Sequence, residues 1–151
     1  MMRRLAFLFL LFLLVICGAP ARDPTYDLLI RNGRVLDGAG NPWRYADIAV
    51  LNGRIAAIGR LGNVQSGETI DARGMFVTPG FIDVHSHAGP GLAGELNKAE
   101  PLLAQGITTA AVNPDGGGPA DIAPQRAGYE KRGTGVNVAL FVPHGSIRRK
   151  V

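Results

Sequence analysis

The sequence has little cysteine and no clustered basic surface. Cys17 is its single cysteine and lies in an apolar run near the N-terminus. If that run is removed, the mature chain has no cysteine, and disulfides cannot hold its fold together. The formal charge is +4, but the basic residues are scattered, and the clusters at 3–4 and 148–150 do not alternate with aromatic residues. Nucleic acid is therefore not an expected partner.

The apolar run itself has the form of a secretory signal. Two arginines, Arg3 and Arg4, precede it, and Ala19-Pro20-Ala21 follows it with the small residues that signal peptidase reads. The run at 5–17 is too short to span a hydrocarbon core of about 30 Å comfortably. We therefore expect a signal peptide at 1–21 and a periplasmic or secreted protein without stable membrane association after cleavage. An uncleaved N-terminal anchor is the alternative.

Residues 22–78 are predicted to form a small antiparallel β module. Glycine is abundant, at 21 residues, but apolar residues make up 46% of the chain, which favours tight turns over disorder. Asn32-Gly33 and Asn52-Gly53 are predicted turns, and the second is the clearest hairpin signal. The expected strands cover residues 26–30, 34–37, 47–51, 54–58, 68–71 and 75–77.

Residues 79–151 alternate strands with helices, which predicts βαβ units and a parallel sheet. The first strand is apolar enough to be buried on both faces. Pro101 must kink the first helix or start a second one. The expected strands are 81–85, 108–112 and 136–142, and the expected helices are 95–105 and 120–131.

The α/β part is expected to be truncated after about three barrel-type strands. Three such strands leave an open edge and exposed faces, and no helix or cap is predicted after the third strand. We therefore expect an incomplete domain that, alone, is poorly folded and catalytically inactive.

His85-Ser86-His87 is the sharpest chemical signal. Side chains two apart on a strand point the same way, with Cα atoms about 6.5–7 Å apart, so the two imidazoles can converge on one metal ion. Asp83 precedes them on the same face and could line the same cavity. The alternative is a pair of histidines simply exposed in a loop.

Two further strand ends carry polar residues. Asp115 follows the second strand in a glycine-rich loop, where it either lines a site or caps the next helix. His144 follows the third strand as a candidate ligand, proton shuttle or substrate contact, although a lone histidine is more often structural. Ser146 has no visible base partner and is not read as a nucleophile. Polar groups at three successive strand ends are typical of the top of a (β/α) barrel.

The segments "YDLLIRNGRVLDGAG", "DIAVLNGRIAAIG", "IDARGMFVTPGFIDVHSH" and "GITT" resemble the amidohydrolase superfamily, and most closely its N-acyl-D-amino-acid deacylase (D-aminoacylase) branch. The resemblance covers nearly all of residues 26–151. It implies the N-terminal part of a TIM (β/α)8 barrel, preceded by strands of a small β-sandwich. It also implies one or two divalent metals, usually zinc.

The resemblance assigns roles to individual residues. His85 and His87 match the family's first-strand metal ligands. Asp115 stands where these deacylases carry a ligating cysteine, so it is the third expected metal ligand and a departure that could alter metal choice. His144 and Ser146 fall in a segment close to the site and are assigned to substrate binding. No catalytic residue is expected in this part of the enzyme, because the general base comes from a later strand.

The leading interpretation is a metal-dependent hydrolase of linear, non-peptide amides such as N-acyl-D-amino acids, acting on a small molecule. A cyclic amidase of the dihydroorotase or hydantoinase kind is the alternative within the superfamily. A secreted, non-catalytic β-sandwich binding module is the alternative of another class, but it does not explain polar groups at three strand ends. The sequence leaves the oligomeric state open.

Overall fold

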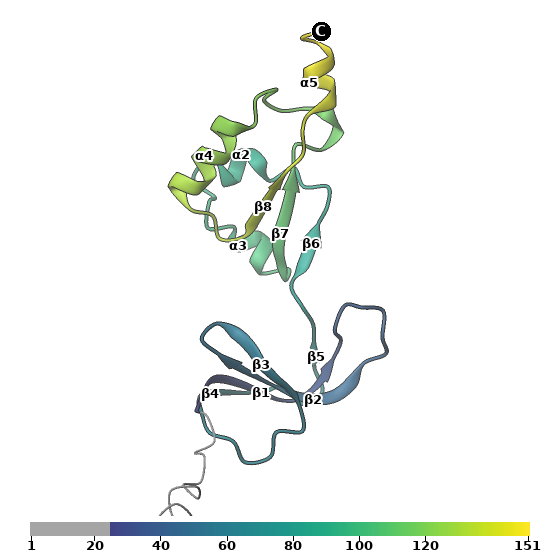
Figure 1. Cartoon of the computed structure of the whole chain (residues 1–151), viewed down its shortest axis with the longest axis vertical. Coiled ribbons are helices and arrows are strands. Elements are labelled where there is room, and N and C mark those ends of the chain that lie inside the picture. Colours follow the sequence, from purple (N-terminus) through teal and green to yellow (C-terminus); the bar gives the residue numbers. More distant parts are fainter. Residues whose placement is uncertain (1–24) are drawn as a thin grey trace, which may run out of the picture. The chain divides into compact units, whose positions relative to one another are not determined.

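A computed structural model of the chain describes residues 25–151, and the predicted signal peptide at 1–21 lies outside them. The chain divides into two compact units between Thr78 and Pro79 (Figure 1), and each is described by itself. Within residues 25–151, no helix combines the length and the apolar character needed to cross a membrane.

The first unit is a five-stranded mixed sheet. Its order is β3-β2-β1-β4, and β5 also pairs with β1. The pairs β1–β2 and β2–β3 are antiparallel, whereas β4 and β5 run parallel to β1, so the prediction of a wholly antiparallel module is wrong. The cause is that the chain crosses over from β3 to the far side of β1 instead of making another hairpin. The strands are β1 (Tyr26–Val35), β2 (Arg44–Leu51), β3 (Arg54–Gly59), β4 (Ser66–Asp71) and β5 (Phe76–Val77).

The two Asn-Gly pairs of this unit behave differently. Asn52 and Gly53 have φ angles of 53° and 70° and join β2 to β3, which confirms the predicted two-residue hairpin. Asn32-Gly33 is not a turn: it lies inside β1, at a register shift between Ile30 and Gly33. The left-handed Asn32 is absorbed there as a β-bulge, so one long strand replaces the two that were predicted.

The second unit contains a parallel sheet of order β6-β7-β8, with helical segments between successive strands. This confirms the predicted α/β alternation. Figure 1 shows α2, α3 and α4 on one side of this sheet. The elements are β6 (Phe81–Asp83), α2 (Gly89–Leu92), α3 (Glu100–Leu103), β7 (Ile107–Val112), η1 (Pro114–Gly116), α4 (Ala123–Arg132), β8 (Asn137–Leu140) and α5 (His144–Arg148).

Several boundaries differ from the prediction. Of the expected helix at 95–105, only the four-residue α3 forms, because the left-handed Ala99 precedes α3 and Pro101 lies in its first turn. Proline is tolerated there because the first-turn N–H groups have no intrahelical partner. The expectation that no helix follows the third strand is wrong, because α5 begins at His144. The carbonyl of Pro143 accepts a hydrogen bond from the Ser146 N–H at the start of this helix.

β6 is shorter and more exposed than predicted. It ends at Asp83 rather than at residue 85. Phe81, Ile82 and Val84 are 58%, 64% and 67% exposed, so the strand is not buried on both faces within the described chain. The reason is its place at the edge of the sheet, with β7 on one side and no described strand on the other.

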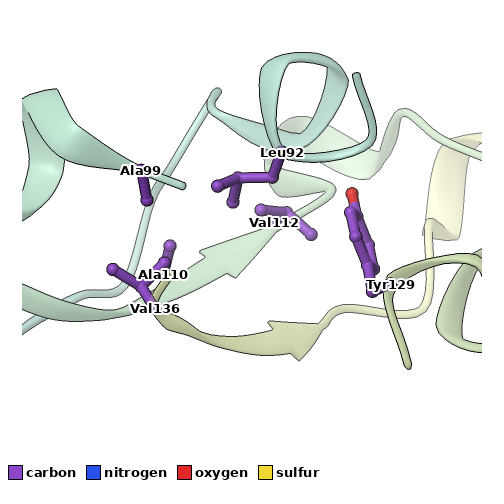
Figure 2. Packing of buried hydrophobic residues seen from close by; sticks show 6 residues of the cluster. All are labelled: Leu92, Ala99, Ala110, Val112, Tyr129 and Val136. Carbon is purple, nitrogen blue, oxygen red and sulfur yellow. The ribbon is translucent and has the colours of Figure 1, made fainter. Parts of the chain in front are cut away.

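The core of the second unit lies between β7 and the helices. Ala110 and Val112 are two residues apart in β7, so they lie on the same face of the strand, and both are fully buried. Figure 2 shows Val112 next to Leu92 and Tyr129, and Ala110 next to Val136. Burying a side chain of the size of Leu92 stabilises a fold by about 1.5–3 kcal/mol, so this cluster fixes the central strand under the helices. The buried members are Leu92, Ala99, Ala110, Val112, Tyr129 and Val136.

Candidate metal centre

The polar residues follow the carboxyl ends of three parallel strands and therefore lie at the same end of the sheet. His85 and His87 follow β6, Asp115 lies in η1 after β7, and His144 begins α5 after β8. Because β6, β7 and β8 run parallel, these ends share one side of the sheet. Open α/β sheets bind their ligands at this carboxyl-terminal end of the strands.

His85, His87 and Asp115 converge. The Nε2 atom of His85 lies 3.3 Å from Oδ1 of Asp115, and Nε2 of His87 lies 3.2 Å from Oδ2. One ligand atom of each residue lies within 4.8 Å of the other two, and the imidazole centroids are 5.4 Å apart. One carboxylate therefore faces both imidazoles, with one oxygen directed to each.

These distances suit a shared metal ion. Donors bound at about 2.0–2.1 Å around a tetrahedral zinc ion are separated by about 3.3–3.4 Å. Each nitrogen–oxygen distance is close to this value, and the two distances end on different oxygens of the Asp115 carboxylate. Direct charge-assisted hydrogen bonds are shorter, at about 2.7–2.9 Å. Two imidazoles and a carboxylate are also a donor set that zinc accepts, and three protein ligands leave one position for water or substrate.

The backbone around Ser86 makes the two histidines converge. Ser86 is only 3% exposed, and its N–H donates to the carbonyl of Ala111 in β7 at 2.9 Å. The side chains of His85 and His87 on either side of it are exposed. Asp83, predicted to line the same cavity, is not in the donor group, because its Oδ1 accepts the His85 N–H at 3.1 Å and stabilises the turn out of β6.

Asp115 is presented by a loop with unusual backbone angles. Asn113 has φ 64° and Asp115 has φ 60°, both left-handed, with Pro114 between them. Outside glycine this conformation is costly, and Asn and Asp adopt it most readily. Gly116 follows with φ 71°, where an added Cβ would lie 2.8 Å from the Gly145 nitrogen. The loop is therefore closely packed against the start of α5.

His144 and Ser146 lie beside this loop without joining the donor group. His144 is exposed and is not among the three clustered ligands. The Ser146 hydroxyl accepts a hydrogen bond from the Arg149 guanidinium at 3.0 Å. The structure therefore brings together three of the five predicted site residues and places the other two on the adjacent helix.

Sequence reasoning assigned no role to three residues next to the site: Asn113, Gln125 and Tyr129. The Asn113 and Gln125 amides exchange two hydrogen bonds, and the Tyr129 hydroxyl donates to the Gly89 carbonyl. No spacing pattern marks them, although Gln125 and Tyr129 are four apart on α4 and therefore share one helix face.

Two cavities open on this unit. One, of about 830 Å³, lies beside the donor group and is lined by His87, Asp115, Asp121 and several prolines. The other, of about 840 Å³, lies between α4 and β8 and contains none of the three donors. The first is the cavity relevant to the metal centre.

Comparisons with known proteins show what the chain is similar to. A family model described as "Amidohydrolase family" matches residues 68–143. N-acyl-D-glutamate deacylase from Alcaligenes xylosoxydans xylosoxydans is 35% identical over 143 residues, an alignment that covers 81% of this chain and 29% of the relative. The chain thus spans less than a third of that relative's length.

Two solved structures are similar in fold. One is N-acyl-D-glutamate deacylase from Bordetella bronchiseptica, crystallised with zinc and a phosphonate inhibitor that mimics the tetrahedral intermediate. It matches with a TM-score of 0.71 and 34% identity, over 83% of this chain and 31% of its own. L-hydantoinase from Arthrobacter aurescens matches with a TM-score of 0.57 and 29% identity, over 77% of this chain and 27% of its own.

Proposed function

The chain belongs to the amidohydrolase family, and from this premise we propose that the protein hydrolyses linear amides of the N-acyl-D-amino-acid class with the help of zinc. One observation carries the proposal: His85, His87 and Asp115 direct two imidazole nitrogens and a carboxylate at one another from two strand ends. The deacylase relatives favour an N-acylated amino acid as the small-molecule substrate.

The residues present fit a divalent metal. His85 and His87 would hold it through Nε2, and Asp115 would add a negatively charged oxygen. When bound, zinc polarises an amide carbonyl and lowers the pKa of a bound water to about 7. Asp115 also compensates the positive charge that a divalent ion brings to the two neutral imidazoles. No general base is assigned, because all three side chains are engaged as ligands.

We place His144 and Ser146 on the substrate side of this centre. α5 begins at His144, and the Gly145 nitrogen lies against Gly116, one residue after Asp115. A side chain at the start of α5 is therefore close to the proposed ligand loop. The parallel strands β6, β7 and β8, with proposed ligands at the carboxyl ends of β6 and β7, support a (β/α) barrel as the parent fold. The N-terminal sheet would be part of a β-sandwich.

The leader supports export to the periplasm or the medium. Its basic start, apolar run and Ala19-Pro20-Ala21 motif are features of a cleaved signal. N-terminal sequencing of the exported protein tests this, with Arg22 as the expected first residue; a mature protein that keeps the apolar run would contradict it.

A linear amide is preferred over a cyclic one. The deacylase structure matches this chain with a TM-score of 0.71, against 0.57 for the hydantoinase. A non-catalytic binding module would not require a metal centre at all. The three possibilities therefore differ in both metal uptake and substrate.

The test is an assay of the full-length protein with N-acetyl-D-glutamate, its L-enantiomer and hydantoin. We expect hydrolysis of the D-amide, loss of activity on chelation, recovery with zinc, and no metal uptake by His85→Ala. Ring opening of hydantoin without deacylation would instead identify a cyclic amidase. A wild-type protein that takes up no zinc and hydrolyses none of the three would support the binding module.

A further inference from the structure

We infer that one face of α4 positions both metal-ligand loops, and that Gln125 and Tyr129 are positioning residues for the metal centre. The inference rests on the proposed function, because it assumes that His85, His87 and Asp115 bind metal. Neither residue contacts the donor atoms in the structure. They act through Gly89 and Asn113, each of which lies two residues from a proposed ligand.

Tyr129 holds the loop that carries His87. Its side chain is buried, and its hydroxyl donates to the carbonyl of Gly89 at 3.0 Å. The ring packs in the core with Leu92 and Val112, as Figure 2 shows. The hydroxyl is therefore a fixed donor that sets the distance between α4 and the chain two residues beyond His87.

Gln125 holds the loop that carries Asp115. Its Nε2 donates to Oδ1 of Asn113 at 3.1 Å, and Nδ2 of Asn113 donates back to Oε1 of Gln125 at 2.9 Å. The Gln125 Nε2 also lies 3.5 Å from the Tyr129 hydroxyl. Since Gln125 and Tyr129 are one helical turn apart, a single helix face contacts both loops.

The third strand end joins the same network. Nδ2 of Asn113 also donates to the carbonyl of Phe141 at 3.1 Å, just after β8. The Phe141 N–H donates to the carbonyl of Val112, the residue before Asn113. The Asn113 side chain is therefore held from α4 and from β8 at once.

This bonding maintains a backbone that would otherwise relax. Asn113 and Asp115 are both left-handed, a conformation that persists outside glycine only when its surroundings impose it. If the amide pair is lost, the loop can leave this conformation, and the two carboxylate oxygens no longer face the two imidazoles. Removing a partner that orients a metal ligand typically weakens metal affinity about 10–100-fold.

The test compares Gln125→Ala, Gln125→Glu and Tyr129→Phe in the full-length protein, with Gln105→Ala as the control. The exposed Gln105 also donates its side-chain N–H to a backbone carbonyl, that of Pro101 at 2.9 Å, but it does not contact the network. Zinc affinity is measured against a chelator, and the visible spectrum of the Co²⁺-loaded protein reports ligand geometry.

We expect zinc affinity to fall about 10–100-fold in Gln125→Ala, with a changed Co²⁺ spectrum. Gln125→Glu keeps the acceptor for Asn113 but loses the donor, so it should recover part of the affinity. Tyr129→Phe keeps the ring and loses only the donor to Gly89, so it should also bind zinc more weakly. Gln105→Ala should match the wild type in both measurements.

The outcomes separate this inference from the proposed function. If Gln125→Ala and Tyr129→Phe lose thermal stability but keep wild-type zinc affinity and Co²⁺ spectrum, both residues are purely structural and the inference is wrong. If Gln125→Ala does not fold, Gln125→Glu and Tyr129→Phe decide by the same criteria. If the wild-type protein binds no zinc, both the proposed function and this inference are wrong. If His85→Ala loses zinc binding while the Gln125 and Tyr129 variants keep it, only the positioning role is wrong.

Discussion

Asp115→Asn should remove most of the stabilisation that zinc gives to the folded protein. Asparagine has nearly the same size and also tolerates the left-handed conformation found at φ 60°. It replaces one of the two carboxylate oxygens, which lie 3.3 and 3.2 Å from the imidazole nitrogens, by an NH₂ group that cannot bind a metal. It also removes the negative charge. The change therefore tests the ligand and leaves the backbone in place.

The size of the effect follows from linkage between binding and folding. Zinc at 100 times the wild-type Kd stabilises the folded state by about 2.7 kcal/mol. We assume that Asp115→Asn weakens zinc binding about 100-fold, which is the upper end of the loss seen for indirect partners and a modest loss for a direct ligand. At the same zinc concentration, the stabilisation of the folded state then falls to about 0.4 kcal/mol. The difference of about 2.3 kcal/mol is well above the error of a urea titration performed with and without zinc.

A neighbouring carboxylate provides the matched control. Asp121 lines the same cavity, but its Oδ1 accepts the Ala123 N–H at 3.0 Å and it is not in the donor group. Asparagine caps backbone N–H groups as well as aspartate does, so Asp121→Asn should keep the full response to zinc. An Asp115→Asn protein that is still stabilised by about 2.7 kcal/mol at the same zinc concentration would refute the ligand role of Asp115.

Three further substitutions test the packing of two glycines and the cause of one pKa shift. Gly135→Ala should lower the free energy of unfolding in urea by about 3 kcal/mol, the upper end of overpacking costs, because the new Cβ would lie 1.9 Å from the Lys98 carbonyl oxygen. Gly128→Ala in α4, where the new Cβ would meet no atom within 4 Å beyond the local helix backbone, should instead raise it by about 0.5–1 kcal/mol. Equal effects of the two substitutions would contradict the packing described. The Asn32 amide, which donates to Asp71 at 2.8 Å, is the main cause that lowers the pKa of that carboxyl, so Asn32→Gly should raise it in an NMR titration. Because the pKa of Asp71 is lower in the folded than in the unfolded protein, the stability that Asp71 contributes is present above the unfolded pKa and is lost as the pH falls through the folded pKa. An unchanged Asp71 pKa in Asn32→Gly would contradict the role of the Asn32 hydrogen bond.

The sequence was sufficient for the parts of the fold that depend on periodicity. Alternating apolar runs and helical stretches predicted that β6, β7 and β8 form a parallel sheet, and the Asn52-Gly53 signal predicted the hairpin. The same pattern placed polar residues at three strand ends, and the family resemblance singled out Asp115 as the third ligand beside His85 and His87, which the structure brings together.

Features that depend on three-dimensional neighbours could not be predicted in this way. Asn32-Gly33 has the same sequence signature as the true turn, yet the parallel partners β4 and β5 keep β1 continuous across it. The burial expected for β6 failed because apolar content does not reveal whether a strand is central or at an edge. The partnership of Asn113 with Gln125 is equally hidden, since two amides 12 residues apart carry no periodic signal.

In the loop that presents Asp115, the cost of the left-handed backbone is nearly balanced by the hydrogen bonds that hold it. This balance favours a functional reason for the shape of the loop. Left-handed backbone at Asn113 and Asp115 costs about 1–2 kcal/mol each. Three hydrogen bonds from the Asn113–Gln125 pair and the Phe141 carbonyl offset this by about 0.5–1.5 kcal/mol each. The two sums are similar, so the arrangement adds little to the stability of the fold. What it does provide is a carboxylate with one oxygen facing each imidazole, and strained backbone held in place by its surroundings is typical of sites where geometry matters more than stability.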